Sequence, residues 1–350
     1  MSLDHLTIRG VRNLETVELT PAPGVNWFYG DNGAGKTSVL EALYLLGRGR
    51  SFRASQVASV IQHDQPLLQV VARRAGSGLR LGIERSRDDW RGRIAGKDSR
   101  RISEFAAVMP LVLVEPDSHR LVDGGPDQRR QYMDWQLFHV EQGYLEAWQR
   151  YARLLRQRNM ALKTGAGDNT LAALESVMAP AAESLNQLRQ RQVEQITELS
   201  QLLLETLGFR LPGELGLRYR PGHPTERGLA ESWSEQRASD RERGFTQRGP
   251  HRADLVLTCA GHPAAQEMSR GQQKLLALAL LLAQLLMLQR HASHKPLLLL
   301  DDPVSELDAR HLASLLGWLE TQPFQSWITA TSQPDRCFKL FHVERGMVAT

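Results

Sequence analysis

The stretch that decides the fold is Gly30-Asp31-Asn32-Gly33-Ala34-Gly35-Lys36-Thr37, followed directly by Ser38. It matches G-x-x-x-x-G-K-[ST], the sequence pattern of a phosphate-binding loop. An apolar run, Val25–Tyr29, precedes the loop, and residues 38–46 after it have helical character. A strand, a glycine-rich loop and a helix in this order are the context that such a loop requires. The stretch therefore predicts a nucleotide-binding α/β lobe.

Each residue type in the loop has a physical reason. Glycines let backbone N–H groups turn toward phosphate oxygens, and the helix N-terminus adds a partial positive charge. We expect Lys36 to neutralise the β- and γ-phosphates of ATP and the Thr37 hydroxyl to bind Mg²⁺, with Ser38 on the first turn. A chance glycine loop is the alternative, and two further elements downstream argue against it.

The first of these elements is an apolar run that ends in two acids, Leu297–Leu300 followed by Asp301 and Asp302. A buried strand of this kind places its carboxylates at the carboxyl edge of a sheet, where α/β folds bind ligands. We expect Asp301 to hold Mg²⁺ and Asp302 to orient or deprotonate the attacking water. The alternative is a helix N-cap, since Asp302-Pro303 also suits a helix start.

The second element is the cluster of Ser269, Gly271 and Gln272 before the apolar stretch 275–290. A hydroxyl and free backbone N–H groups at a helix N-terminus favour an anion. Ordinary capping is the alternative, because Ser269 is a suitable N-cap with Gln272 three residues on.

Composition bounds the class of protein. The 350 residues are 41% hydrophobic and 23% charged, which is typical of a soluble globular chain with a large core. The formal net charge of +4 suits a polyanionic partner such as DNA, although an arginine-rich genome gives the same balance. Cys259 and Cys337 form no C-x-x-C pair, so we expect neither a disulfide framework nor a cysteine zinc site, but a reducing cytoplasm.

No membrane association is expected. The N-terminus lacks a basic segment followed by a long apolar run, so it does not read as a secretory signal. The most apolar stretch, 275–288, is shorter than the ~20 residues of a membrane span. It also contains Gln284, and a buried core helix is the better interpretation.

Periodicity divides the chain into three parts. Residues 1–115 predict a first ATPase lobe with strands near 3–8, 17–19, 25–29 and 111–114 and a hairpin of 67–72 with 79–84. Residues 116–210 predict a helical arm, with antiparallel helices over 144–160 and 171–207 joined by a turn at 164–169. Residues 211–350 predict the second part of the ATPase lobe, with a parallel sheet formed from strands such as 297–300 and 327–329. The polar stretch 221–248 is either a loop with a solvated helix or partly mobile.

Together these elements resemble the ABC-type ATPases. The resemblance implies a P-loop ATPase head, a mixed sheet flanked by helices, with the helical arm inserted into it. It also implies that Ser269, Gly271 and Gln272 close over the γ-phosphate held by a second copy, in an ATP-dependent homodimer. Ser305-Glu306-Leu307-Asp308 resembles the D-loop at that interface.

The insert between Lys36 and Ser269 is longer than in transporter ATPases and far shorter than in SMC or Rad50-like proteins. An intermediate helical insert resembles the RecF family of recombination mediators. The resemblance implies ATP-dependent binding of DNA at gaps or stalled forks, and RecR-type and RecO partners that help load RecA. Roles in DNA replication, repair and the SOS response follow from it. An SMC-like structural ATPase and a transporter subunit remain alternatives. The matching stretches are residues 6–14, 124–134, 249–254 and 269–274.

Two departures from the wider pattern concern hydrolysis. Asp302 stands where many ABC ATPases have Glu, and the shorter carboxylate indicates slow hydrolysis that serves as a switch. As an enzyme, the chain is expected to be a weak DNA-stimulated ATPase. No switch histidine follows the strand at 327–329, and Thr331 is the candidate for a γ-phosphate contact there.

Arginines supply the candidate DNA surface. Contacts to phosphates give affinity that is independent of sequence and sensitive to salt. A solvated basic face is the alternative interpretation. The candidates are Arg48, Arg50, Arg53, Arg73, Arg74, Arg80, Arg85, Arg87, Arg91, Arg93, Arg100 and Arg101.

Overall fold

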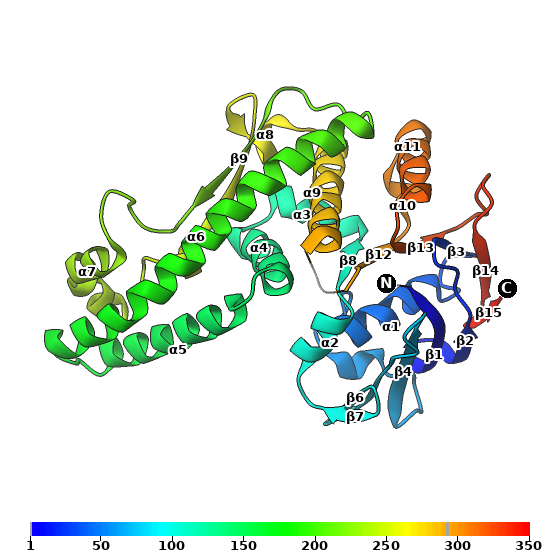
Figure 1. Ribbon diagram of the computed structural model, residues 1–350, viewed down its shortest axis with the longest axis horizontal. Helices are drawn as coiled ribbons and strands as arrows, with labels where there is room; N and C mark the ends of the chain where they lie inside the picture. Colours follow the sequence, from blue (N-terminus) through cyan, green and yellow to red (C-terminus); the bar gives the residue numbers. More distant parts are fainter. Residues whose placement is uncertain (1, 292–293) are drawn as a thin grey trace. The chain divides into compact units, whose positions relative to one another are not determined.

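The computed structural model describes residues 2–291 and 294–350, which form two compact units (Figure 1). The nucleotide unit holds the chain up to Ser118 together with Leu203–Phe209 and Leu281–Thr350. The helical unit holds His119–Leu202 and Arg210–Leu280.

The expected boundary at residue 211 differs from the structure, since residues 210–280 belong to the helical unit. The physical reason is strand pairing. β9 (Leu215–Arg220) and β10 (Asp254–Cys259) pair with each other in a separate antiparallel sheet, which β11 (His262–Pro263) completes.

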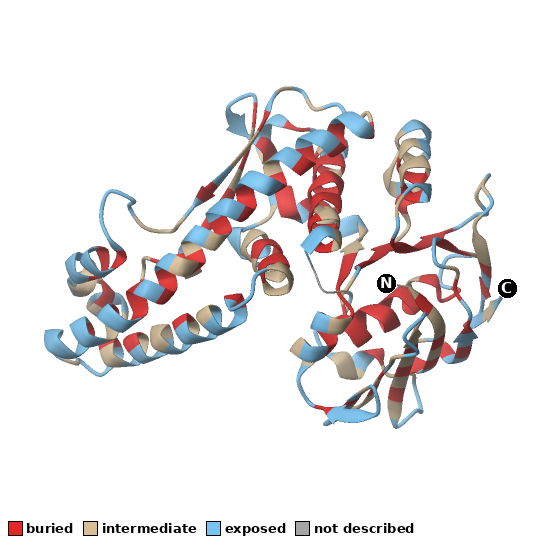
Figure 2. Ribbon diagram, viewed as in Figure 1, coloured by how far each residue is buried: buried red, intermediate tan, exposed pale blue. Residues whose placement is uncertain are grey.

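A six-stranded sheet forms the centre of the nucleotide unit, in the order β15-β14-β3-β13-β12-β8. Its strands are parallel except for β15, and the predicted parallel sheet is confirmed. β12 and β13 are buried throughout, as strands of a parallel sheet covered on both faces are (Figure 2). β12 is a run of four leucines, whereas β13 also contains Gln325, Ser326 and Thr329. β14 and β15 were not predicted. The bounds are β3 Val25–Tyr29, β8 Leu111–Val114, β12 Leu297–Leu300, β13 Gln325–Ala330, β14 Lys339–Glu344 and β15 Met347–Ala349.

A second, antiparallel sheet has the order β2-β1-β4-β5-β6-β7. The predicted hairpin is confirmed, with Val70 opposite Ile83 in β4 and β5. Alternating residues such as Leu81 and Ile83 are buried on the inner face, which leaves the outer face to polar side chains. The bounds are β1 Leu3–Val11, β2 Leu14–Leu19, β4 Leu67–Arg74, β5 Arg80–Ser86, β6 Trp90–Ile94 and β7 Lys97–Ser99.

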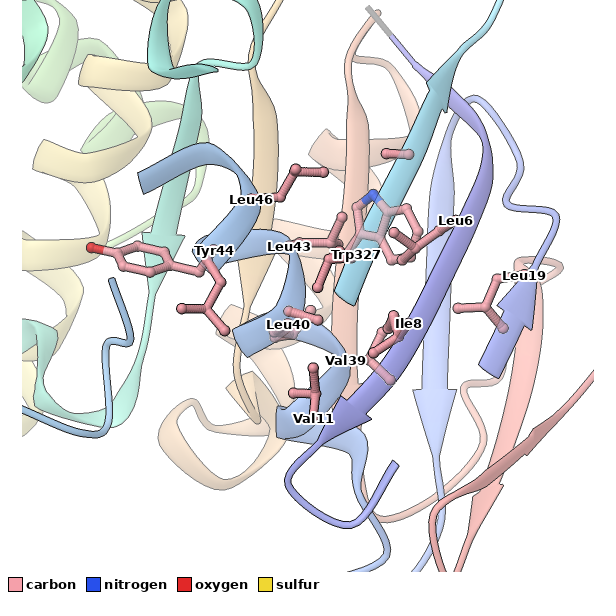
Figure 3. Close-up of a cluster of buried hydrophobic side chains, with 14 of the residues drawn as sticks. Leu6, Ile8, Val11, Leu19, Val39, Leu40, Leu43, Tyr44, Leu46 and Trp327 are labelled. Carbon is pink, nitrogen blue, oxygen red and sulfur yellow. The ribbon is translucent and has the colours of Figure 1, made fainter. Parts of the chain in front are cut away.

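Helix α1 (Lys36–Arg48) lies in the core shared by the two sheets (Figure 3). Leu40 and Leu43 on this helix are buried together with Ile8 of β1 and Trp327 of β13. This packing anchors the helix that carries the predicted phosphate loop. The unit also contains α2 Ile102–Val108, α10 Pro303–Glu306 and α11 Ala309–Glu320, with 3₁₀ turns at Val57–Val60 and Pro116–His119.

The helical unit is built around α5 (Tyr144–Lys163) and α6 (Asp168–Thr206). They form the predicted antiparallel pair across the turn near residues 164–167, and the polar stretch 221–248 contains α7 (Leu229–Arg243). The other helices are α3 Arg120–Asp123, α4 Pro126–Val140, α8 Ala264–Glu267 and the first half, up to Leu280, of α9 Arg270–His291, with a 3₁₀ turn at Pro250–Arg252.

Helix α9 is the apolar helix expected in the core. It is long and apolar enough to cross a membrane, but 72% of its most apolar window is buried inside the protein. Tyr132 of α4 donates a hydrogen bond of 2.7 Å to the carbonyl oxygen of Leu280 on this helix. These contacts support the interpretation as a core helix.

Residues 249–254 are linked by hydrogen bonds to two helices in the interior of the helical unit. His251 Nε2 donates to the carbonyl oxygen of Thr246 at 2.9 Å, so its Nδ1 accepts the hydroxyl of Tyr151 at 2.7 Å. Burial lowers the pKa of His251 to about 4, which keeps the ring neutral. Arg189 of α6 donates to the carbonyl oxygen of Pro250. The stretch therefore joins α5 and α6.

A fully buried ion network joins α5, α6 and α7. Arg158 donates to Glu175 at 2.9 Å and to Asp240 at 2.7 Å, and none of the three side chains is more than 2% exposed. Arg237 also donates to Glu175, so both buried carboxylates have cationic partners. A buried charge is tolerated only when it is paired in this way.

Replacing Arg158 by Ala removes the cation from between two buried carboxylates. We expect the free energy of unfolding to fall by about 3–5 kcal/mol, because Glu175 and Asp240 keep their burial but lose a partner. Urea denaturation followed by circular dichroism measures the loss. Arg241→Ala is the control, since its partner Asp168 is exposed, and equal losses in both variants would contradict the prediction.

Candidate nucleotide-binding site

The predicted phosphate loop lies between the carboxyl end of β3 and the N-terminus of α1. Gly30, Gly33 and Gly35 have φ values of 148°, 80° and 118°, a region that L side chains rarely adopt. A Cβ on Gly30 would lie 2.1 Å from the carbonyl oxygen of Val343 in β14. Glycine is therefore required here both by the backbone and by the neighbouring strand.

Lys36 places its ammonium inside the loop. Its Nζ donates to the carbonyl oxygens of Gly30 at 2.6 Å and Asp31 at 2.8 Å, and the residue is only 8% exposed. Burial lowers the pKa of Lys36, and the charges of Asp302, Asp301 and Asp31 oppose that shift. The loop thus encloses a cation whose present partners are neutral carbonyl groups, which suits an anionic ligand.

Asp301 joins the loop to the edge of the sheet. Its Oδ1 accepts hydrogen bonds from the hydroxyls of Thr37 and Thr329, each at 2.8 Å. Burial raises the pKa of Asp301, while the two hydroxyls and the charge of Arg53 act in the opposite direction. The sequence predicted that Thr37 and Asp301 share a site, and the structure brings them together.

Thr329 was missed by the sequence analysis. Its hydroxyl also accepts the backbone N–H of Asp302 at 2.9 Å, so it links the two acids. Pairing of β12 with β13, which sets Leu300 opposite Ile328, brings it to the same edge. Thr331, the residue expected here, is exposed. The sequence signal that could have indicated Thr329 is a hydroxyl side chain directly after Trp327 and Ile328 near the end of a strand.

Asp302 is held in an unusual backbone conformation, with φ at 49°. Its Oδ2 accepts the hydroxyl of Ser305 at 2.6 Å, whereas Oδ1 is buried without a hydrogen-bond partner among the described residues. Although α10 begins at Pro303, the Asp302 side chain makes no capping hydrogen bond to that helix. An orphaned buried carboxylate oxygen indicates a site for a ligand or water.

The oxygen donors here fit Mg²⁺. Thr37 offers a hydroxyl and Asp301 a carboxylate, which are the hard oxygen ligands that this ion takes. Among residues 2–291 and 294–350, no group of three or more His, Cys, Asp or Glu side chains is placed to hold a metal. Few protein ligands are normal for Mg²⁺ bound together with phosphates.

Asn13, in the turn between β1 and β2, supports the loop from outside. Its amide nitrogen donates to the carbonyl oxygens of Gly33 at 3.2 Å and Ala34 at 3.0 Å, and its oxygen accepts the hydroxyl of Ser38 at 3.1 Å. Gly346, in the β14–β15 turn, donates its N–H to the same Ala34 oxygen at 2.8 Å. Two turns that are distant in sequence thus hold one loop.

The neighbouring Arg12 holds the helix that follows the loop. Its guanidinium makes two hydrogen bonds of 2.9 Å to Glu41, a fully buried acid on α1. Ser51, beyond the end of the helix, also donates to Glu41. The dipeptide Arg12-Asn13 therefore fixes both the loop and its helix.

Ser269, Gly271 and Gln272 lie at the N-terminus of α9, in the helical unit. Gln272 Oε1 accepts the N–H of Ser269 at 2.9 Å, and Ser269 Oγ accepts the N–H of Gln272 at 3.3 Å. This reciprocal pair is the capping box that the ordinary interpretation predicted. Ser269 and Gly271 are exposed, so capping leaves them accessible.

The family model described as RecF/RecN/SMC N terminal domain matches residues 2–347. The chain is 39% identical to the DNA replication and repair protein RecF of Thioalkalivibrio sulfidiphilus, over 99% of this chain and 98% of that protein. It is 40% identical to the Azotobacter vinelandii protein of the same name, over the same shares.

Solved structures show the same fold. A structure of the recombination mediator protein RecF with ATP, described as part of the RecFOR pathway, has a TM-score of 0.87 and 27% identity, covering 99% of this chain and 96% of that one. An SMC head bound to a domain of ScpA shares the fold, with a TM-score of 0.58 and 16% identity over 99% and 96% of the two chains. The predicted head fold is confirmed.

Replacing Asn13 by Ala tests the support of the loop. Each lost hydrogen bond contributes a net ~0.5–1.5 kcal/mol to the stability of the loop conformation that binds ATP. We therefore expect the dissociation constant for ATP to rise about tenfold. Isothermal titration calorimetry measures it. Asn169→Ala, an exposed change in the helical unit, is the control, and an unaltered dissociation constant for Asn13→Ala would exclude a role in positioning.

Proposed function

The chain belongs to the RecF family of the SMC-type ATPase superfamily, and we propose that it is an ATP-dependent DNA-binding mediator of recombination and repair. The observation that carries the proposal is the hydrogen bond between Thr37 and Asp301, which joins the phosphate loop to the sheet edge across 264 residues of sequence. Such a junction is what a nucleotide switch needs, because it ties the loop to the acids that act on the phosphates.

Residues 30–38 hold the triphosphate, with Lys36 neutralising the β- and γ-phosphates. Thr37 and Asp301 hold Mg²⁺, which supplies charge neutralisation on the phosphate oxygens. Asp302, through its unpartnered Oδ1, orients and deprotonates the attacking water. The aspartate side chain reaches less far than glutamate, so hydrolysis is slow and resets a switch. The chain acts as a weak DNA-stimulated ATPase.

Closure requires a second copy of the chain. Ser269, Gly271 and Gln272 of one copy close over the γ-phosphate held by the other, and the exposure of Ser269 and Gly271 at the N-terminus of α9 supports this role. Free N–H groups and the helix dipole favour the phosphate's negative charge. The closed homodimer binds DNA at gaps or stalled forks in the cytoplasm. There, with RecR-type and RecO proteins, it assists recombinase loading.

An SMC/Rad50-like structural ATPase is the second candidate. Full-length identity of about 39% to RecF proteins, against 16% to an SMC head, favours the mediator. A transporter subunit would need a membrane permease and is the weakest candidate. Co-purification with a RecR-type protein, and not with a permease, separates these functions.

The trans arrangement of the site is tested by light scattering with and without ATP. Lys36→Ala should abolish both ATP binding and dimerisation, whereas Lys163→Ala, an exposed lysine in the helical unit, should dimerise normally.

Ser269→Ala and Ser269→Asp should each bind ATP as monomers yet fail to dimerise. Aspartate keeps the helix cap but repels the γ-phosphate. Normal dimerisation of Ser269→Asp would therefore show that Ser269 acts only as a helix cap.

Asp302→Asn tests the assignment of the base. We expect the amide to slow ATP hydrolysis about 10²-fold or more, because it does not accept the proton of the attacking water. ATP should stay bound and the dimer should persist, as phosphate release and light scattering would show. Ser305→Ala, which removes the hydrogen bond to Oδ2 alone, is the milder control. Turnover at or above the wild-type rate in Asp302→Asn would contradict the role.

A further inference from the structure

The antiparallel sheet of the nucleotide unit carries a groove of about 640 Å³ over β4, β5, β6 and β7. Gly82, at the centre of β5, contributes to its floor and stands opposite Val71 of β4 and Arg93 of β6. A Cβ added to Gly82 would meet only ordinary contacts, the nearest at 3.5 Å from Val71, and its φ is not in the left-handed region. Neither packing nor backbone geometry requires this glycine, and its effect is to keep the groove open.

Arginines dominate the charge of this groove. Arg80, Arg91, Arg93 and Arg100 line it and are all exposed. Alternation along the strands explains the placement, because Leu81 next to Arg80 on β5 and Gly92 between Arg91 and Arg93 on β6 are buried on the inner face. Two neighbouring strands therefore direct their charged residues outward while their apolar residues fill the core.

Most of this charge is uncompensated. Arg93 donates to Asp98 at 2.9 Å, in a pair whose side chains are 68% and 80% exposed. Within the described part of the chain, the side chains of Arg80, Arg91 and Arg100 make no ion pair or hydrogen bond. Glu84 is the other acid in the lining, so cations outnumber acids. Free guanidinium groups in a hollow bind anions, and their planar forks match phosphate oxygens.

The spread of the cations identifies the kind of anion. Residues two apart on a strand are ~6.5 Å apart and neighbouring strands ~4.8 Å apart, so these cations extend over a line rather than around a point. A single phosphate occupies one point, whereas a nucleic-acid strand presents a row of phosphates. We propose that this groove binds the sugar–phosphate backbone of duplex DNA through Arg80, Arg91, Arg93 and Arg100, an inference that rests on the proposed function.

Contacts of this kind are independent of sequence and weaken as salt increases. The test compares wild-type protein with the triple variant Arg80→Gln, Arg91→Gln, Arg100→Gln, using a fluorescent DNA duplex with ATP at several salt concentrations. We expect about a tenfold or larger loss of affinity. The slope of log K against log salt should fall by up to about 0.9 for each lost contact.

The matched control is Arg150→Gln, Arg153→Gln, Arg156→Gln, three exposed arginines of α5 with the same change in net charge. It should keep the affinity and slope of the wild type, and both triple variants should keep ATP-dependent dimerisation. Gly82→Val is a second test, since it fills the groove without changing the charge, and it should also weaken DNA binding.

The outcomes separate the two proposals. A wild-type protein that binds no duplex at any salt concentration overturns the proposed function itself. If the groove triple variant binds DNA with the same affinity and the same salt dependence as the wild type, the assignment of DNA binding to the groove is wrong, and the proposed function is unaffected. Displacement of DNA by poly-glutamate as readily as by unlabelled duplex would show a general acidic-polymer site, and it also overturns the assignment to phosphates.

Discussion

The site depends on one partly buried carboxylate. Asp301 Oδ1 accepts hydroxyls from Thr37, on the helix after the phosphate loop, and from Thr329, on the neighbouring strand. Such a carboxylate is costly to bury, as its raised pKa reflects, and it stays in place because both hydroxyls compensate it. Any movement of the loop away from the sheet edge breaks this compensation, so the order of the parallel strands and the position of the loop are coupled.

The loop is equally constrained on its other side. Three of its glycines have positive φ, which gives the backbone its shape but no rigidity of its own. Rigidity comes from Asn13 and Gly346, which bind Ala34 from two separate turns. The antiparallel sheet is therefore part of the nucleotide site, because the β1–β2 turn ends against the loop.

Local signals predicted what depends on local chemistry. The glycine loop and the acids after Leu300 were found because each pattern serves one chemical purpose in a short stretch. Thr329 and Asn13 were missed, since their roles arise only from strand pairing and from a turn far away in sequence. The boundary at 211 was misplaced for the same reason, because pairing of β9 with β10 assigns those residues to the helical unit. The strand Trp90–Ile94 was not predicted, because glycine and arginine interrupt its alternation of apolar residues.

The number of arginines determines how basic a chain is, but it does not show which of them are accessible to an anionic ligand. In the helical unit, Arg158, Arg189 and Arg129 are buried or nearly so and neutralised by carboxylates, so they serve the fold. On the outer face of the antiparallel sheet, Arg80 and Arg91 are exposed and serve no neighbour that the structure describes. When the paired arginines are set aside, an excess of positive charge remains in this groove, where it is available to an anionic ligand.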